Sequence, residues 1–265
     1  MTMNNHQLPS TQTAASELFN YVHHQATGRL IIIHKSTQYC FDLFQGQIAT
    51  AILSIHRRRR WQRAVQQHAP QWQHELEPQG TRQNWERLHL HHGVSEGWLT
   101  CKQAKAILKQ STQEVLFSLI HVSKYQLYWQ PSASTLCPRW TLSRRVLKEI
   151  YEEAQELSAN WHELGLKPRW VHQAFQLDPS LDLQANVFAD LTACLDGNHS
   201  FWDLTLDLSV SRATISRILH HFLEQGILQR LPLADLPAAE SPQPSHAQII
   251  ELDAHISYIP EMVLA

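Results

Sequence analysis

The segment from Thr27 to Ile52 constrains the fold more than any other part of the chain. It contains two runs, TGRLIIIHK and STQYCFDLFQGQIATAI. The first run is apolar and β-branched, and the second alternates, with Tyr39, Phe41 and Leu43 on one face. Short apolar runs between polar or glycine turn residues predict a β-meander. The segment carries no reactive group in a catalytic pattern, so we expect a sheet that serves packing or pairing.

Helices and one more strand are expected around this meander. Apolar residues at helical spacing predict a helix over Ala14–Gln25, preceded by a disordered tail at residues 1–13. Thr100 is placed to cap a helix over Cys101–Lys109. The pattern Ser111–Glu114 is a capping box and predicts the start of another helix. An alternating run from Lys124 to Gln130 predicts a strand that returns to the opening sheet.

An arginine run follows the meander. Residues 56–65, HRRRRWQRAV, predict a helix that ends before Pro70, with Trp61 in its buried stripe. Four consecutive arginines span about 300° of helix surface, so one or two must lie along the protein. One interpretation is a structural helix with a carboxylate-paired arginine. The other is a contact site for an acidic partner, formed by Arg57, Arg58, Arg59 and Arg60.

The pattern changes near residues 138–141, where we expect a subdomain boundary, and strands nearly vanish after it. A long helix is predicted over Leu142–Leu164, and two short helices over Arg169–Phe175 and Ala185–Leu195. Residues 201–231 then predict a helix, a tight turn at 209–211, a second helix over Arg212–Gln225, and a strand over Ile227–Leu231. We interpret the segment 141–231 as helical and winged-helix-like.

The turn and second helix match bacterial helix-turn-helix domains closely. The matching residues are Val210, Ser211, Thr214, Ile215, Ser216, Arg217 and Leu219, and the departures are Thr205 and Ser209. In such domains the N-terminal residues of the second helix face the bases, here Arg212, Ala213, Ser216 and Arg217. Residues 201–231 hold three arginines against three carboxylates, so phosphate contacts are scarce. Packing or protein contact is therefore favoured, and DNA binding is the alternative.

Composition restricts the remaining functions. Residues 1–140 hold 14 Lys and Arg against 7 Asp and Glu, whereas residues 141–265 hold 8 against 17, which gives the net charge of −2. The chain has no apolar run of about 18 residues and four separated cysteines, at positions 40, 101, 137 and 194, and its polar first residues do not read as a secretory signal. We therefore expect a cytoplasmic protein without a membrane span.

Chemistry-bearing motifs are missing from the sequence. The histidines at 23–24, 89–92 and 220–221 lack a carboxylate or cysteine at a metal-site spacing, so we expect plain surface histidines and no metal. The chain has no GxGxxG, GxxxxGK[ST], GxSxG or HExxH, and only eight glycines. We expect neither a cofactor nor enzymatic activity.

Several of these residues together resemble a known family. The series Glu17-Leu18-Phe19, Thr27-Gly28-Arg29-Leu30, Tyr39, Gly46-Gln47-Ile48-Ala49 and Arg58-Arg59-Arg60-Trp61 is similar to the PatA N-terminal (PATAN) domain of cyanobacterial response regulators. The run from Gln103 to Leu119 fits as well, and the resemblance covers residues 14–231. The specificity lies in the order and spacing of these short motifs.

The resemblance implies an α+β domain that acts as a non-enzymatic output or adaptor module in a two-component phosphorelay. Relatives act in phototaxis, type IV pilus motility and cell patterning, through contacts with signalling or pilus-motor proteins. In the family, a receiver domain follows a Pro-rich linker. The phosphoacceptor aspartate of that receiver is missing from this sequence. The resemblance therefore implies a receiver in cis or trans, and we expect that this chain alone does not accept phosphate from a histidine kinase.

The expected organisation has five parts. A small antiparallel sheet with helices forms the PATAN-like α+β domain. The parts are the tail at 1–13, that domain at 14–140, the winged-helix-like segment at 141–231, a linker at 232–247, and a remnant of the first receiver strand at 248–265.

Overall fold

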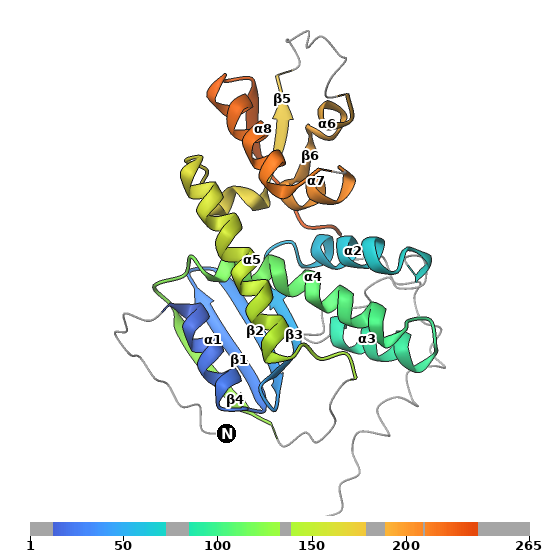
Figure 1. Ribbon diagram of the computed structural model, residues 1–265. Helices are drawn as coiled ribbons and strands as arrows, with labels where there is room; N and C mark the ends of the chain where they lie inside the picture. Colours follow the sequence, from blue (N-terminus) through green and yellow to red (C-terminus); the bar gives the residue numbers. More distant parts are fainter. Residues whose placement is uncertain (1–12, 73–84, 133–138, 179–188, 209, 238–265) are drawn as a thin grey trace, which may run out of the picture.

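A computed structural model describes residues 13–72, 85–132, 139–178, 189–208 and 210–237 of the chain (Figure 1). The fold is α+β, as predicted from the sequence. A four-stranded antiparallel sheet carries helices on one face, and a smaller three-stranded sheet lies at the other end of the molecule. The tail at 1–12 and the segment 238–265 lie outside the described residues.

The large sheet contains the predicted meander and the predicted returning strand. It is built from β1 (Gly28–His34), β2 (Thr37–Phe44), β3 (Gln47–Leu53) and β4 (Gln126–Pro131), in the order β3-β2-β1-β4. All neighbouring strands are antiparallel. Gly46 makes the turn into β3 with φ +73, and a Cβ there would lie 2.3 Å from the carbonyl oxygen of Val22. Only glycine fits this close approach of the turn to the preceding helix.

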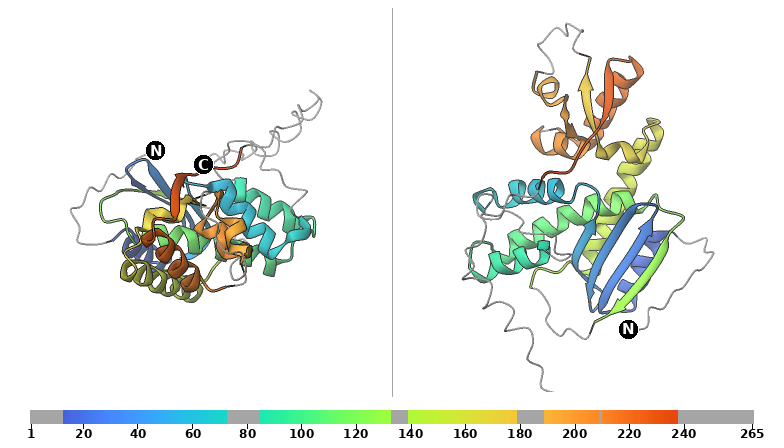
Figure 2. Two further views of the ribbon diagram at one scale, coloured as in Figure 1. Left: turned by 90° about the horizontal axis from the view of Figure 1, so that it is seen from above. Right: turned by 180° about the vertical axis from the view of Figure 1, so that it is seen from behind.

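One face of this sheet is covered by α1 (Ala14–His23), α4 (Cys101–Leu119) and α5 (Arg144–Glu163) (Figure 1). The predicted alternation of β2 holds, because Tyr39, Phe41 and Leu43 belong to the main core under these helices. The right view of Figure 2 shows the other face from behind, and no helix of the described residues lies over it in that view. Ile31, Cys40 and Ile52 form a small separate cluster. The main core therefore lies between the sheet and the helices.

A helical layer adjoins β3. It consists of α2 (Arg57–His68), the 3-10 turn η1 (Pro70–Trp72), α3 (Trp85–Ser95) and α4. Trp61 packs edge to face on Trp72 and on Trp85 within it, with ring centroids 6.0 and 5.3 Å apart. Trp61 is buried, as predicted for the stripe of this helix.

The helix α4 corrects one expectation. Thr100 caps it as predicted, in a capping box with Gln103, but the helix continues without interruption to Leu119. Ser111 and Glu114, which were expected to start a second helix, lie buried in its middle. The Glu114 carboxylate is occupied by Arg63 and does not reach back to a helix amide. The contact of Glu114 with Arg63 therefore outweighs the local capping pattern, and the helix continues through Ser111.

The C-terminal half contains more strand than expected. After the 3-10 turn η2 (Pro168–His172) come β5 (Gln173–Leu177), α6 (Ala189–Cys194), β6 (Asp196–Ser200), α7 (Phe201–Asp207), α8 (Arg212–Glu224) and β7 (Leu228–Pro232). The strands form a second antiparallel sheet in the order β6-β5-β7. The expectation that strands nearly vanish after residue 141 was wrong, as was the helix over Arg169–Phe175, which is a 3-10 turn followed by β5.

The helix-turn-helix order was predicted correctly, since α7, α8 and β7 follow one another as expected. The long helix α5 connects both ends of the molecule, since it packs on α4 at one end and on α8 at the other (Figure 1). None of the helices in the described ranges is long and apolar enough to cross a bilayer.

Candidate functional site

The arginine run lies at the junction of the two sheets, where α2 meets the end of the described chain. The helix α2 begins after His56, which has φ 48 and forms no side-chain cap. The carboxylate of Asp235 supplies the cap instead, accepting hydrogen bonds from the backbone amides of Arg58 at 3.1 Å and Arg59 at 3.0 Å. A carboxylate there satisfies free amides and is favoured by the helix dipole.

The side chains of Arg58 and Arg59 strengthen the same contact. We call residues 233–236 the C-terminal strap. Nη1 of Arg58 donates to the carbonyl of Leu236 at 3.3 Å, and Nε of Arg59 donates to the carbonyl of Ala234 at 2.8 Å. Arg59 also reaches β6, where its Nη1 donates to the carbonyl of Asn198. The part of the predicted linker that the structure describes is therefore held against α2.

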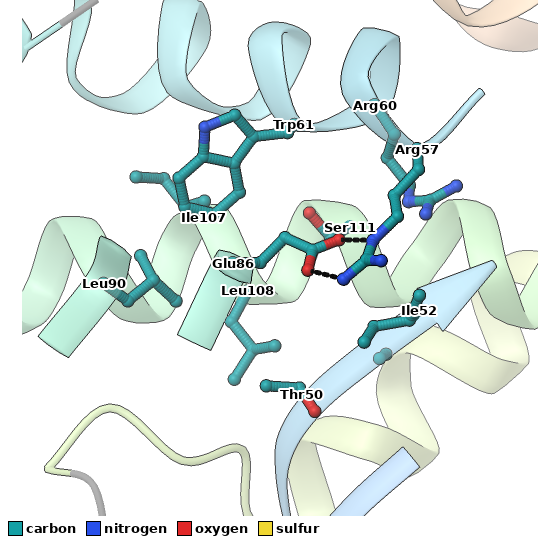
Figure 3. A pocket seen from close by; sticks show the side chains of 11 residues that line it. Thr50, Ile52, Arg57, Arg60, Trp61, Glu86, Leu90, Ile107, Leu108 and Ser111 are labelled. Atoms are coloured by element: carbon teal, nitrogen blue, oxygen red, sulfur yellow. Dashed lines mark hydrogen bonds and ion pairs between the residues drawn. The ribbon is translucent and has the colours of Figure 1, made fainter. Parts of the chain in front are cut away.

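Arg57 points to the opposite side of α2 and forms a two-pronged ion pair with Glu86 of α3 (Figure 3). Its guanidinium also lies over the ring of Trp85, 5.1 Å from the ring centroid. The cavity around this pair, lined in part by Trp61, Leu90 and Ile107, leaves space of about 20 Å³. Such a volume holds one water molecule and excludes an organic ligand.

Arg60 and Arg63 are buried in the junction. The guanidinium of Arg60 donates to the carbonyls of Leu53 at 2.7 Å and Ile55 at 3.1 Å, where β3 ends. Burial lowers the pKa of Arg60 to about 10. Arg63 forms ion pairs with Glu114 of α4 and Asp203 of α7, each at 2.6 Å. Burial opposes the charge of Arg63, but the two carboxylates outweigh it and raise its pKa.

The four predicted partner contacts thus all bind groups of the same chain. Arg57 binds α3, Arg58 and Arg59 bind the C-terminal strap, and Arg60 binds the end of β3. The carboxylate-paired arginine of the structural interpretation is observed in Arg57. Contact of this run with an acidic partner stays a prediction, and such a partner would have to compete with the internal bonds.

Two histidines lie in the same junction. The Nε2 atom of His56 lies 2.7 Å from the carbonyl oxygen of Leu233 in the strap, and its ring packs edge to face on His172 at 5.7 Å. The Nε2 atom of His172 lies 3.0 Å from the hydroxyl of Ser118. Burial, together with the positive charge of Arg60 and Arg63, lowers the pKa of His172 to about 3. His172 is therefore neutral at pH 7.

The predicted helix-turn-helix contacts lie in different environments. The Ser216 hydroxyl is fully buried, accepting from Nε1 of Trp161 at 2.8 Å and donating to the carbonyl of Arg212. Arg212 lies over the ring of Trp202 at 5.5 Å, and its Nη2 donates to Gln113. Burial lowers the pKa of Arg212. Of Arg212, Ser216 and Arg217, only Arg217 is exposed. In this arrangement Ser216 cannot face a base, and the guanidinium of Arg212 is already bound to Gln113 and Trp202.

A polar cleft of about 360 Å³ lies between α2 and α7. Its charged side chains pair with one another: Arg63 binds Asp203, and His199 lies 3.8 Å from Asp207. Burial would raise the pKa of Asp203, but Arg63 and Ser200 outweigh it and lower that pKa. Burial raises the pKa of Asp207. In the described ranges no group of three His, Cys, Asp or Glu side chains is arranged to hold a metal ion.

An exposed apolar surface lies on the outer side of α3. Among the described residues, three large apolar side chains are exposed: Leu88 at 49%, Trp98 at 41% and Val210 at 46%. Leu88 and His92 are one helical turn apart, and the ring of His92 packs edge to face on Trp98 at 5.0 Å. We call Leu88, His92 and Trp98 the α3 surface. Exposed tryptophan is uncommon on a surface without a partner and is enriched in interface hot spots.

Sequence interpretation missed the residues that complete the junction. Asp235 was assigned to a linker and Glu114 to a capping box, and Asp203 was counted only as a charge. The pattern Ser200-x-x-Asp203 was a usable signal, because it is the capping box that begins α7. No local signal marks Asp235, since its partner is 177 positions away.

Comparison with known proteins adds no identification. No family model matches the chain, and neither a curated protein nor a solved structure matches it.

Proposed function

We propose that this chain is a non-enzymatic protein-interaction module that binds its partner through the α3 surface. The observation that carries the proposal is the clustering of Leu88 and Trp98, two of the three large apolar side chains exposed in the described part of the chain. His92 packs on Trp98 and lies one helical turn from Leu88, which places the three side chains on one side of α3. A tryptophan in a small apolar area is a typical anchor for a protein partner.

The charge arrangement agrees with this proposal. Arg57 to Arg60, Arg63 and Arg212 all bind groups within the chain, so these six side chains would have to give up internal bonds to contact phosphate. DNA affinity depends on several such contacts. The order of α7, α8 and β7 and the exposed Arg217 favour the alternative, transcriptional regulation through DNA, but Arg217 is a single cation.

The resemblance to PATAN domains supplies the expected setting. The module serves as an output or adaptor in two-component signalling, in phototaxis, type IV pilus motility or cell patterning. Its partners are signalling or pilus-motor proteins, together with a receiver domain in cis or trans. In this proposal the module acts by binding other proteins, and it catalyses no reaction.

Affinity capture from a native lysate, followed by mass spectrometry, tests the proposal. We compare the wild-type chain with Trp98→Ser and with the matched control Val210→Ser, which removes an equally exposed apolar side chain elsewhere. A filter-binding titration with DNA at low salt runs in parallel, with Arg217→Ala as its variant.

The expected result is a set of proteins retained by the wild type and by Val210→Ser and lost with Trp98→Ser. An unchanged set with Trp98→Ser contradicts the proposed surface. DNA binding that weakens with Arg217→Ala supports the transcriptional alternative instead.

A further inference from the structure

The outer edge of β4 is a second surface, and it is distinct from the α3 surface. The large sheet ends at β4, and no other described strand pairs with its outer side. The opposite edge is different, because Ile48 of β3 and Leu142 exchange two backbone hydrogen bonds, at 3.0 and 2.9 Å. The edge of β4 therefore presents backbone donors and acceptors to a partner strand.

Proteins usually protect such an edge with charged side chains, bulges or proline. The residues Gln126 to Gln130, QLYWQ, carry no charge, and the only such protection is Pro131 at the end of the strand. The strand is also attached to α1, since Trp129 stacks on Tyr21 with ring centroids 4.4 Å apart. A neutral, aromatic and fixed edge favours the addition of a strand.

The side chains of β4 divide cleanly between the two faces of the sheet. Leu127 and Trp129 pack on the main core under the helices. Tyr128 lies on the other face, against the small cluster of Ile31, Cys40 and Ile52. Gln126 and Gln130 share the face of Tyr128 and are exposed.

This pattern is symmetric about Tyr128. If two copies of β4 pair antiparallel around a two-fold axis at Tyr128, then Gln126 lies opposite Gln130 of the second copy. Leu127 then lies opposite Trp129, and the two Tyr128 side chains are neighbours. Amide faces amide, apolar faces apolar, and no like charges meet. A shift by two residues in either direction places Gln opposite Tyr and pairs fewer residues of the strand.

We propose that two copies of this chain associate through the outer edge of β4, in the register centred on Tyr128, and so join their large sheets into one. The contact is isologous, as in most homodimers. Because the strand is short, the interface is small and the dimer dissociates on dilution.

Charge substitutions at Gln126 and Gln130 test this register. Both side chains are exposed, and they are too far apart along one strand to pair with each other. Gln126→Lys combined with Gln130→Lys places lysine opposite lysine across the two-fold axis. Gln126→Lys combined with Gln130→Glu changes the same two positions but places lysine opposite glutamate.

Sedimentation equilibrium of the full chain, from micromolar to sub-millimolar concentration, measures the dimer dissociation constant. We expect the wild type to dimerise, the double-lysine variant to bind about tenfold more weakly, and the lysine–glutamate variant to bind at least as tightly as the wild type. Far-UV circular dichroism confirms that both variants are folded. A wild type that stays monomeric overturns the proposal. Equal dissociation constants for the two variants overturn it as well, because they place the contact elsewhere.

Discussion

Removal of the Glu114 carboxylate should destabilise the protein strongly. The side chains of Glu114 and Arg63 are each 4% exposed, and their two hydrogen bonds measure 2.6 and 3.2 Å. In Glu114→Ala the buried guanidinium keeps only Asp203 as a carboxylate partner. Loss of one member of a buried ion pair costs about 3–5 kcal/mol. Domains are stable by about 5–15 kcal/mol, so a large fraction of the stability is lost.

Urea unfolding followed by far-UV circular dichroism measures this loss. With an m value of about 3 kcal/mol/M, the midpoint should fall by about 1–1.7 M. The matched control is Lys148→Ala, which breaks the exposed pair with Glu152, whose side chains are 70% and 57% exposed. Exposed pairs contribute little, so its midpoint should not move measurably.

A double-mutant cycle measures the interaction energy between Arg63 and Glu114 separately from the other effects of each substitution. Arg63→Met with Glu114→Leu replaces the pair by apolar side chains and leaves no uncompensated guanidinium. The Asp203 carboxylate loses Arg63 in this double variant and equally in Arg63→Met alone, so that loss cancels in the cycle. The double variant should therefore lose clearly less stability than the sum of the single variants. Additive losses, or a loss below about 1 kcal/mol in Glu114→Ala, would refute the reasoning.

Three further predictions concern the same region. Trp61→Ala removes a buried ring between Trp72 and Trp85 and should cost about 3–5 kcal/mol, measured by urea unfolding; a cost below 1 kcal/mol contradicts its core role. Asp235→Ala removes the cap of α2 and should cost about 1 kcal/mol and speed amide hydrogen exchange at the start of α2, whereas unchanged exchange would show that the strap is dispensable. The pKa of His172 is lowered to about 3 in the folded protein, so between about pH 3 and 6.5 the unfolded chain binds a proton at this imidazole more readily than the folded chain does. The contribution of His172 to the free energy of unfolding is therefore fully present above about pH 6.5 and is lost as the pH falls toward 3. The slope from this site is up to about 1.4 kcal/mol per pH unit, and His172→Gln should reduce the measured slope; an equal slope contradicts a buried neutral imidazole.

The sequence was sufficient where the signal is local. The alternation of β2 and the apolar runs of β1 and β3 predicted the meander, because one face of each strand packs on the core. The spacing of apolar residues predicted α5 and α8 in the same way. These elements depend on periodicity that is contained within a single segment.

The failures have a common physical cause. The strand β5 was missed because its hydrogen-bond partners lie in β7, about fifty positions later, as in the pair of Phe175 with Arg230. A break was predicted at Ser111 because the side chain of Glu114 was expected to bind locally, although it binds Arg63. Both assignments were made from sequence neighbours, whereas the contacts that decide the structure are set by tertiary packing.

The candidate site shows the same division. The arginine run was recognised from sequence, but its partners, Glu86, Asp235 and Asp203, come from three other parts of the chain. The exposure of Trp98 could not be predicted from sequence, because the other eight tryptophans are all buried or half-buried and nothing in the local pattern sets Trp98 apart.

The central claim is that this chain acts by binding a protein through the α3 surface. The most direct test is a binding titration of a captured partner against the wild type, Trp98→Ser and Val210→Ser. The claim predicts that Trp98→Ser weakens binding by about 2 kcal/mol or more, which is about thirtyfold in Kd, while Val210→Ser leaves it unchanged. Equal affinities for all three proteins would contradict it.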